Sequence, residues 1–155
     1  MSIQFVDTNI FIRYLTKDDA KKYRACYQLF KQAEQNQISL TTSESVLAEV
    51  VYVLESSYYA VPHEQVKIAL SRLLILPGLK IAHVIIYLRA LTLYAQHKID
   101  FEDCLSVAHM ERQKLGTIIS YDRDFDQVKE IMRMEPKSED MGGSSDDTEI
   151  HNNSR

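Results

Sequence analysis

The chain has 155 residues, a length that suggests a single domain with room for a hydrophobic core. Its formal net charge of −4 argues against a strongly basic, nonspecific nucleic-acid binder. No apolar run approaches the ~20 residues of a membrane span, and the N-terminus lacks the pattern of a secretory signal. The distant cysteines Cys26 and Cys104 favour reduced, packed thiols. We therefore expect a cytoplasmic protein with no membrane partner.

The first stretch, residues 3–15, predicts a strand that runs through a polar turn into a helix. Apolar and β-branched residues fill most of positions 3–6, as in a buried parallel strand. The run stops at Asp7-Thr8-Asn9, three residues that cap helices well and form strands poorly. Apolar side chains then recur at helical spacing, at Ile10, Phe11, Tyr14 and Leu15. Asp7 is thereby placed at the carboxyl end of a strand, where open α/β sheets bind ligands.

Two helices and a short strand are expected next. Asp18 or Asp19 can cap a helix with one apolar stripe, formed by Ala20, Tyr23, Cys26, Tyr27, Phe30 and Ala33. Residues 38–41 predict a strand, and Thr41 with Glu44 resembles a capping box for the helix that follows. In that helix Glu49 shares a stripe with valines 46, 50 and 53. A lone carboxylate there loses solvation unless it is protonated, paired or metal-bound. Glu49 is therefore either a metal ligand or a rim residue paired with a lysine.

The second half of the chain continues the alternation of helices and strands. Helical patterns follow Pro62 and then cover residues 84–96 and 99–114, and candidate strands lie at 79–81 and 117–119. Acids cluster at the start of the last of these helices, at Asp100, Glu102 and Asp103, where the macrodipole favours them. The last strand ends in a second acidic turn, Ser120-Tyr121-Asp122-Arg123-Asp124-Phe125, and a short helix is expected through Gln127, Val128 and Ile131. Residues 1–135 thus predict one domain, and residues 136–155 a disordered acidic tail.

Strands that alternate with helices predict a three-layer α/β/α fold, with a mostly parallel central sheet and helices on both faces. All parallel strands end at the same edge, so we expect Asp7 and Asp122 on one rim. Asp103 begins the helix that leads into the strand before Asp122, and Glu49 lies on the helix after the second strand. Both side chains can reach that rim if the strands are neighbours in the sheet.

Carboxylates gathered in one pocket repel each other, because a pair at ~4 Å costs on the order of 4 kcal/mol at an effective dielectric near 20. Protonation or bound cations must offset this cost, and an all-carboxylate site favours Mg²⁺ or Mn²⁺ over zinc. Such ions, with positions open to water and phosphate, suit phosphodiester hydrolysis. The five histidines form no ligand-spaced pair, and the sequence contains no glycine-rich nucleotide motif and no nucleophile elbow.

Four short motifs, over roughly residues 3–132, resemble the PIN-domain ribonucleases and in particular the compact VapC-type toxins of toxin–antitoxin pairs. The motifs are Val6-Asp7-Thr8-Asn9, Ala48-Glu49-Val50, Asp100-Phe101-Glu102-Asp103-Cys104-Leu105 and Ser120-Tyr121-Asp122-Arg123-Asp124-Phe125. Each motif is weak alone, but their order at this chain length is specific. Cys104 stands where alanine is common, and the acidic tail lies outside the usual pattern; neither departure touches the acids.

The resemblance implies a PIN-like nuclease domain that hydrolyses RNA with Mg²⁺ or Mn²⁺. Its catalytic and metal-binding residues would be Asp7, Glu49, Asp103 and Asp122. Accessory residues would be Asp124 and, through hydrogen bonds that orient the ligands, Thr8, Asn9 and Ser120. The resemblance also implies a homodimer and a cognate antitoxin protein that lies over the active site. Arg13 is either an RNA phosphate contact or an exposed helix residue, and the sequence leaves both open.

Three functions follow from these residues. The first is a metal-dependent endoribonuclease that acts as the toxin of a type II toxin–antitoxin system. The second is a PIN-like nuclease of RNA processing or of structured DNA. The third is a PIN-like module that binds a partner or RNA without cutting it. The complete acid set argues against the third, because a domain released from catalysis has no need for Glu49 in an apolar stripe.

Overall fold

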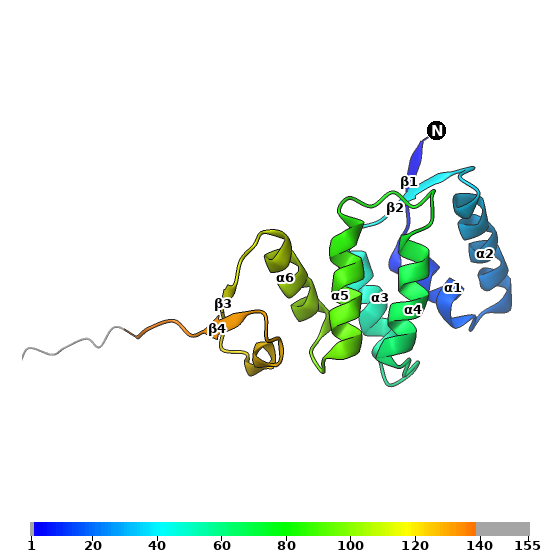
Figure 1. Cartoon of the computed structure of the whole chain (residues 1–155). Helices are drawn as coiled ribbons and strands as arrows, with labels where there is room; N and C mark the ends of the chain where they lie inside the picture. Colours follow the sequence, from blue (N-terminus) through cyan, green and yellow to red (C-terminus); the bar gives the residue numbers. More distant parts are fainter. Residues whose placement is uncertain (1, 139–155) are drawn as a thin grey trace, which may run out of the picture.

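The computed structural model describes residues 2–138, in which short strands alternate with longer helices (Figure 1). The elements follow in the order β1 (Ile3–Phe5), α1 (Thr8–Thr16), α2 (Ala20–Glu34), β2 (Ser39–Thr41), α3 (Glu44–Glu55), α4 (His63–Leu74), α5 (Val84–Gln96), α6 (Phe101–Arg112), β3 (Thr117–Ile119), the 3₁₀ helix η1 (Arg123–Gln127) and β4 (Met132–Met134). Both strand pairs are parallel. The α/β class expected from the sequence is therefore confirmed.

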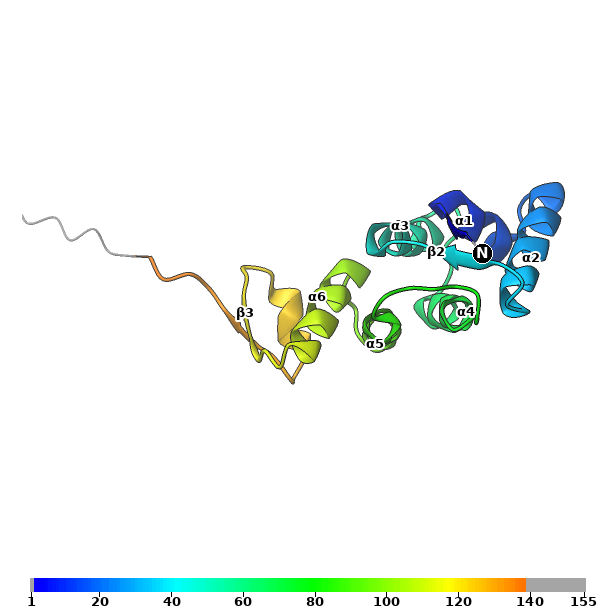
Figure 2. The same cartoon turned by 90° about the horizontal axis from the view of Figure 1, so that it is seen from above.

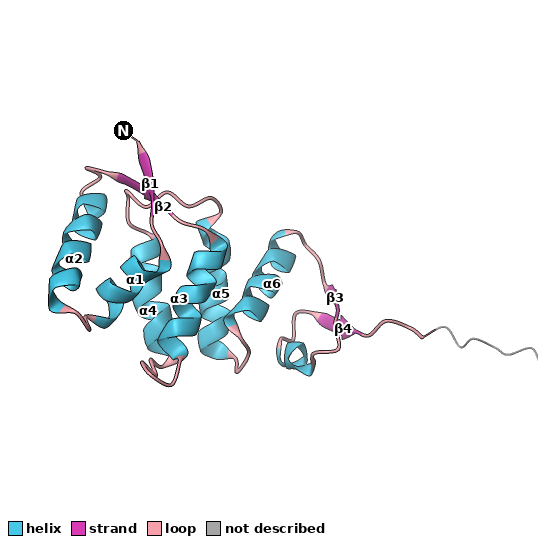
Figure 3. Cartoon of the chain, turned by 180° about the vertical axis from the view of Figure 1, so that it is seen from behind, coloured by secondary structure: helices cyan, strands magenta, loops and turns pink. Residues whose placement is uncertain are grey.

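The core lies mainly among the helices, which stand side by side in Figure 3. Fully buried side chains come from several of them, including Phe11, Phe30, Leu47, Val50, Leu70, Leu91, Leu93 and Tyr94. Tyr94 keeps its polar atom satisfied, because its hydroxyl donates to Glu55 Oε2 at 2.7 Å. The ring of His63 stacks on Tyr94 at a centroid separation of 3.9 Å. The interior of the described chain is thus apolar, with its few polar groups paired at the edge.

The strands form two separate sheets in place of the single central sheet expected from the sequence. β1 pairs with β2, and β3 pairs with β4. The expected strand at 79–81 is reduced to one bridge between Leu40 and Leu79. In Figures 1 and 2, α6 stands between the β3–β4 pair and the rest of the molecule. Each strand of the two sheets has only three residues, which is too short for the sequence to indicate which strands pair.

The segment after Asp122 differs from the expected short helix. Residues 123–127 form the 3₁₀ helix, and the chain then extends into β4. The Met132 N–H donates to the Gly116 carbonyl at 2.8 Å, and Ser120 N–H donates to the Met134 carbonyl at 2.9 Å. Pairing with β3 thus takes the backbone groups that a helix would have used.

Two helix starts also settle open points of the sequence. Asp19 caps α2 by accepting from the Lys22 N–H at 2.9 Å, which leaves Asp18 free to pair elsewhere. Ser43 caps α3 in place of Thr41, which belongs to β2 and donates to the Lys80 carbonyl.

Both cysteines are free and buried, as expected. No helix within residues 2–138 is long and apolar enough to cross a membrane. The predicted disordered tail lies, from residue 139 onward, outside the described residues.

Candidate active site

The first group of predicted residues lies where β1 meets α1. We call Asp7, Thr8 and Glu49 the N-terminal half-site. Asp7 caps α1, and its Oδ1 accepts a hydrogen bond from the Thr8 N–H at 2.8 Å. The Thr8 hydroxyl is buried and donates to Glu49 Oε2 at 2.8 Å. The turn after β1 is thereby tied to a carboxylate that lies 41 residues further along the chain.

Glu49 lies at the exposed rim of its apolar stripe. Its partner is the Thr8 hydroxyl, and within residues 2–138 it forms no ion pair with a lysine. Of the two interpretations of Glu49, the rim position is correct but the lysine partner is wrong. An exposed carboxylate held by one neutral donor keeps its remaining lone pairs available for a ligand.

Arg13 lies beside this half-site and is held by an acid of its own. Together with Asp7, Asn9, Glu49 and Tyr59, among others, it lines an open hollow of about 310 Å³. Its guanidinium pairs with Asp18 Oδ2 at 2.6 Å, and the Tyr59 hydroxyl donates to the same oxygen at 2.6 Å. The bonds from Tyr59 and Arg13 hold the pKa of Asp18 below its usual value. The guanidinium therefore reaches the acidic hollow in a fixed position.

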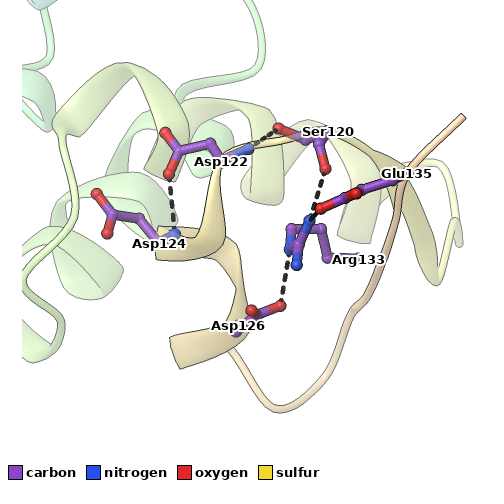
Figure 4. A network of polar contacts seen from close by, with 6 residues as sticks. All are labelled: Ser120, Asp122, Asp124, Asp126, Arg133 and Glu135. Atoms are coloured by element: carbon purple, nitrogen blue, oxygen red, sulfur yellow. Dashed lines mark hydrogen bonds and ion pairs between the residues drawn. The ribbon is translucent and has the colours of Figure 1, made fainter.

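The second group lies at the ends of α6 and β3, and we call Asp103, Asp122 and Asp124 the C-terminal half-site. Asp122 caps η1, with its Oδ1 accepting from the Asp124 N–H at 2.9 Å. The Asp122 N–H in turn donates to Ser120 Oγ at 3.0 Å (Figure 4). Burial, followed by the charges of Asp122, Asp100, Asp124 and Glu102, raises the pKa of Asp103. The acids at the start of α6 and in the turn after β3 therefore lie close enough to repel one another.

Arg133, which the sequence analysis did not single out, supports the turn that carries Asp122. Its guanidinium donates to the Ser120 carbonyl at 2.9 Å, to Asp126 at 3.0 Å and to Glu135 at 2.8 Å. In Figure 4 the Asp122 and Asp124 carboxylates point away from Arg133. Among the described residues, neither of them forms an ion pair. No sequence pattern marks Arg133, because its partners are brought together only by the pairing of β4 with β3.

The two half-sites do not merge within one chain. Among residues 2–138, no three acidic, histidine or cysteine side chains come close enough to hold a metal ion. A cavity of about 470 Å³ between α3 and α6 lies between the halves, lined by Glu49 on one side and by Asp100 and Glu102 on the other. The carboxylates suit Mg²⁺ or Mn²⁺ by their chemistry, but the single chain does not bring them together. The structure thus joins Asp7 to Glu49 and Asp103 to Asp122, and leaves these pairs apart.

Comparison with known families decides the broader assignment. Residues 5–131 match the model of the PIN domain family. The chain belongs to the PIN domain family. PIN domains are generally nucleases that act on RNA or DNA, and they typically use divalent metal ions. No curated protein matches the chain. The matched region of this PIN domain includes both half-sites.

The acid cluster of this PIN domain predicts a pH-dependent stability. The raised pKa of Asp103 means that its ionisation disfavours the folded state. The free energy of unfolding is therefore unaffected by this carboxyl below its pKa in the unfolded state, and it falls as the pH rises through the pKa in the folded state. In EDTA, we expect Asp103→Asn to be more stable than wild type at neutral pH and equally stable below ~3, where the carboxyl is largely protonated in both states. Urea denaturation across this range, with Glu130→Gln as a control at an exposed acid, measures the difference. A wild type more stable than Asp103→Asn at neutral pH would contradict the expected repulsion.

Proposed function

We propose that this PIN domain is an endoribonuclease dependent on Mg²⁺ or Mn²⁺, and that it acts as the toxin of a type II toxin–antitoxin system. One observation carries the proposal. Asp7 and Asp122 each follow a parallel strand and cap the helix after it, and each has further carboxylate neighbours. Two strand ends built alike, both within the family match, supply an oxygen-rich surface suited to a hard cation and a phosphodiester.

The proposed roles follow from the contacts of each side chain. Asp7, Glu49, Asp103 and Asp122 supply the carboxylate oxygens. Thr8 fixes the Glu49 carboxylate, and Ser120 fixes the backbone of Asp122. Asn9 and Arg13 line the hollow beside Asp7, where Arg13 can contact an RNA phosphate in place of Asp18. Asp124 adds negative charge beside Asp122.

The toxin assignment rests on the similarity of the four acidic motifs and of the chain length to VapC-type toxins. The same similarity supports two proposed partners, a second copy of the chain in a homodimer and a cognate antitoxin protein. A second candidate is a PIN-like module that binds RNA or a protein without cutting, and the separation of the two half-sites within one chain favours it. Cleavage decides between the two.

The test is an RNA cleavage assay with Mn²⁺, with Mg²⁺ and with EDTA. We expect single-stranded RNA to be cut with either metal and to remain intact in EDTA. Structured RNA and DNA flaps are assayed in parallel, because preferential cutting of either would favour a processing nuclease. Induced expression should arrest growth, and a small gene encoded next to this one should relieve the arrest. Intact RNA under all metal conditions would contradict the nuclease and leave the binding module as the function.

The bond between Thr8 and Glu49 provides a sharper test of the N-terminal half-site. Thr8→Val removes the hydroxyl donor and keeps the shape of a buried side chain. Partners that orient metal ligands are worth ~10–100-fold in affinity or activity, so we expect cleavage and Mn²⁺ affinity to fall by about that factor. Thr8→Ser keeps the hydroxyl and should retain most of both. Equal activity in Thr8→Val and wild type would show that Glu49 needs no such support.

A further inference from the structure

Two donors from separate segments of the chain converge on one oxygen of Asp18. The Arg13 guanidinium of α1 donates to Asp18 Oδ2 at 2.6 Å, and the Tyr59 hydroxyl donates to the same oxygen at 2.6 Å. Tyr59 comes from the loop between α3 and α4. Arg13 and Tyr59 both line the open hollow of about 310 Å³ at the N-terminal half-site. A cationic donor and a neutral donor therefore share a single charged oxygen beside the candidate active site.

The backbone holds these groups in place. α1 ends at Lys17, whose left-handed conformation, with φ at 56°, turns the chain and places Asp18 beside the helix that it has just left. The loop that carries Tyr59 is closed by a hydrogen bond from the Ala60 N–H to the Ser56 carbonyl at 2.7 Å. The carboxylate and its two donors thus meet in a fixed arrangement.

Asp18 Oδ2 stands where an oxygen of a phosphate group could stand. Arginine and tyrosine side chains are among those through which proteins contact the phosphates of nucleic acids. The bond to Asp18 raises the pKa of Tyr59, so its hydroxyl keeps the proton that it donates. Asp18 is not needed for the helix that follows, because Asp19 caps α2. The side chains of Arg13 and Asp18 remain 32% and 24% exposed, so a ligand from solution can reach both.

An exposed aromatic ring lies next to these donors. Tyr58 is 81% exposed, and its ring contacts that of Tyr59 edge to face, with the centroids 4.7 Å apart. Aromatic rings on which bases stack, placed beside cations that contact the backbone, are the recurring elements of sites for single-stranded nucleic acid. A free phosphate ion would contact only Arg13 and Tyr59, whereas a nucleotide chain can also use Tyr58. The surroundings therefore favour a nucleic-acid strand over a free anion.

We propose that Arg13 and Tyr59 form a subsite for one phosphodiester group of single-stranded RNA, and that Asp18 occupies this subsite until RNA displaces it. Tyr58 supplies the ring on which a neighbouring base stacks. Asp18 is thus an internal competitor of the substrate, and it weakens RNA binding where a supporting residue would strengthen it. The choice of RNA as the ligand rests on the proposed function, but the subsite is tested by binding in the absence of cleavage.

The first test measures the binding of a labelled single-stranded RNA to the full chain by fluorescence anisotropy in EDTA. Asp18→Asn keeps the shape of the side chain and removes its charge, so we expect RNA binding to tighten by about two- to fivefold. Glu34→Gln is the matched control, because it removes an acid from an ion pair with Lys31 at 2.8 Å, outside the hollow, and should bind as wild type does. Unchanged or weaker binding by Asp18→Asn, or an equal gain in both variants, would overturn the proposal.

The second test examines the two donors. Arg13→Gln should weaken RNA binding and lower the slope of log affinity against log salt by about 0.7, as expected for one phosphate contact on a single strand. Lys17→Gln removes a neighbouring cation outside the hollow and serves as its control. Tyr59→Phe is made in the Asp18→Asn chain, where the lost hydroxyl acts only on the RNA, and should reverse part of the gain. An equal fall of the slope in Arg13→Gln and Lys17→Gln, or an undiminished gain without the hydroxyl, would contradict the subsite.

The third test separates a nucleic-acid strand from a free anion. Tyr58→Ala should weaken RNA binding by roughly fivefold or more, because that is the contribution of one base stacked on an aromatic ring. The inhibition constant of inorganic phosphate, added as a competitor, should be the same in this variant and in wild type. Equal RNA affinity in the two chains would contradict the assignment to a strand. A chain that cleaves no RNA in Mn²⁺ but shows the gain in Asp18→Asn would refute the proposed function and leave the subsite in place.

Discussion

Asp7→Asn and Asp122→Asn should each reduce RNA cleavage by about 100-fold or more. Even residues that only orient a metal ligand contribute ~10–100-fold, and these two carboxylates are proposed as ligands themselves. Asparagine keeps the shape and one oxygen but removes the charge. It can also keep the local cap, since the amide oxygen accepts the bond from Thr8 or Asp124 as the carboxylate does. The loss should therefore appear in activity and not in folding. Cleavage of a labelled RNA in Mn²⁺ measures it directly.

The matched control for both variants is Glu130→Gln, which neutralises an exposed acid of the same C-terminal segment. Within residues 2–138, Glu130 forms no ion pair or side-chain hydrogen bond, so its loss should leave cleavage unchanged. Undiminished cleavage by Asp7→Asn or Asp122→Asn, with contaminating nuclease excluded, would remove these residues from the site.

Phe11→Ala should cause the largest loss of stability. Phe11 is fully buried, four residues beyond Asp7 on α1, and its ring lies 5.5 Å from that of Phe30 in α2. Truncating a buried phenylalanine costs ~3–5 kcal/mol through lost transfer free energy and the cavity left behind. A small domain has only ~5–15 kcal/mol of unfolding free energy in total, so a large share would be lost. Urea denaturation followed by circular dichroism gives the difference.

The same substitution should also affect the N-terminal half-site, because α1 carries Thr8 and is capped by Asp7. Ile85→Ala removes an exposed apolar side chain at the start of α5 and should change the stability by no more than about 0.5 kcal/mol. A change below about 1 kcal/mol for Phe11→Ala would show that α1 is not anchored by its apolar face.

Local structure followed closely from the sequence where a strong pattern covered a long segment. The apolar spacing from Val84 to Gln96 predicted α5 with the bounds that the structure shows. The polar breaks at Asp7 and Asp122 correctly marked the points where strands give way to helical turns. These features depend on contacts between near neighbours in the chain, which composition and spacing describe.

Long-range arrangement did not follow in the same way. Three-residue strands have too few side chains to specify their partners, so the separation of β1–β2 from β3–β4 had no signal in the sequence. The β4 strand and Arg133 were missed for the same reason, because both depend on pairing with β3. The grouping of Asp7 with Glu49, and of Asp103 with Asp122, is likewise a property of tertiary packing. The sequence predicted the four acids as site residues, but it gave no sign of their division into two half-sites.

Calorimetric titration of Mn²⁺ tests most directly whether both half-sites serve one metal site. Wild type, Asp7→Asn and Asp122→Asn are titrated under the same conditions, with Glu130→Gln as the control. We expect wild type and the control to bind Mn²⁺ alike, and both other variants to lose at least most of that binding, although their substitutions lie in different half-sites. Unchanged Mn²⁺ binding in either variant would contradict a shared carboxylate site.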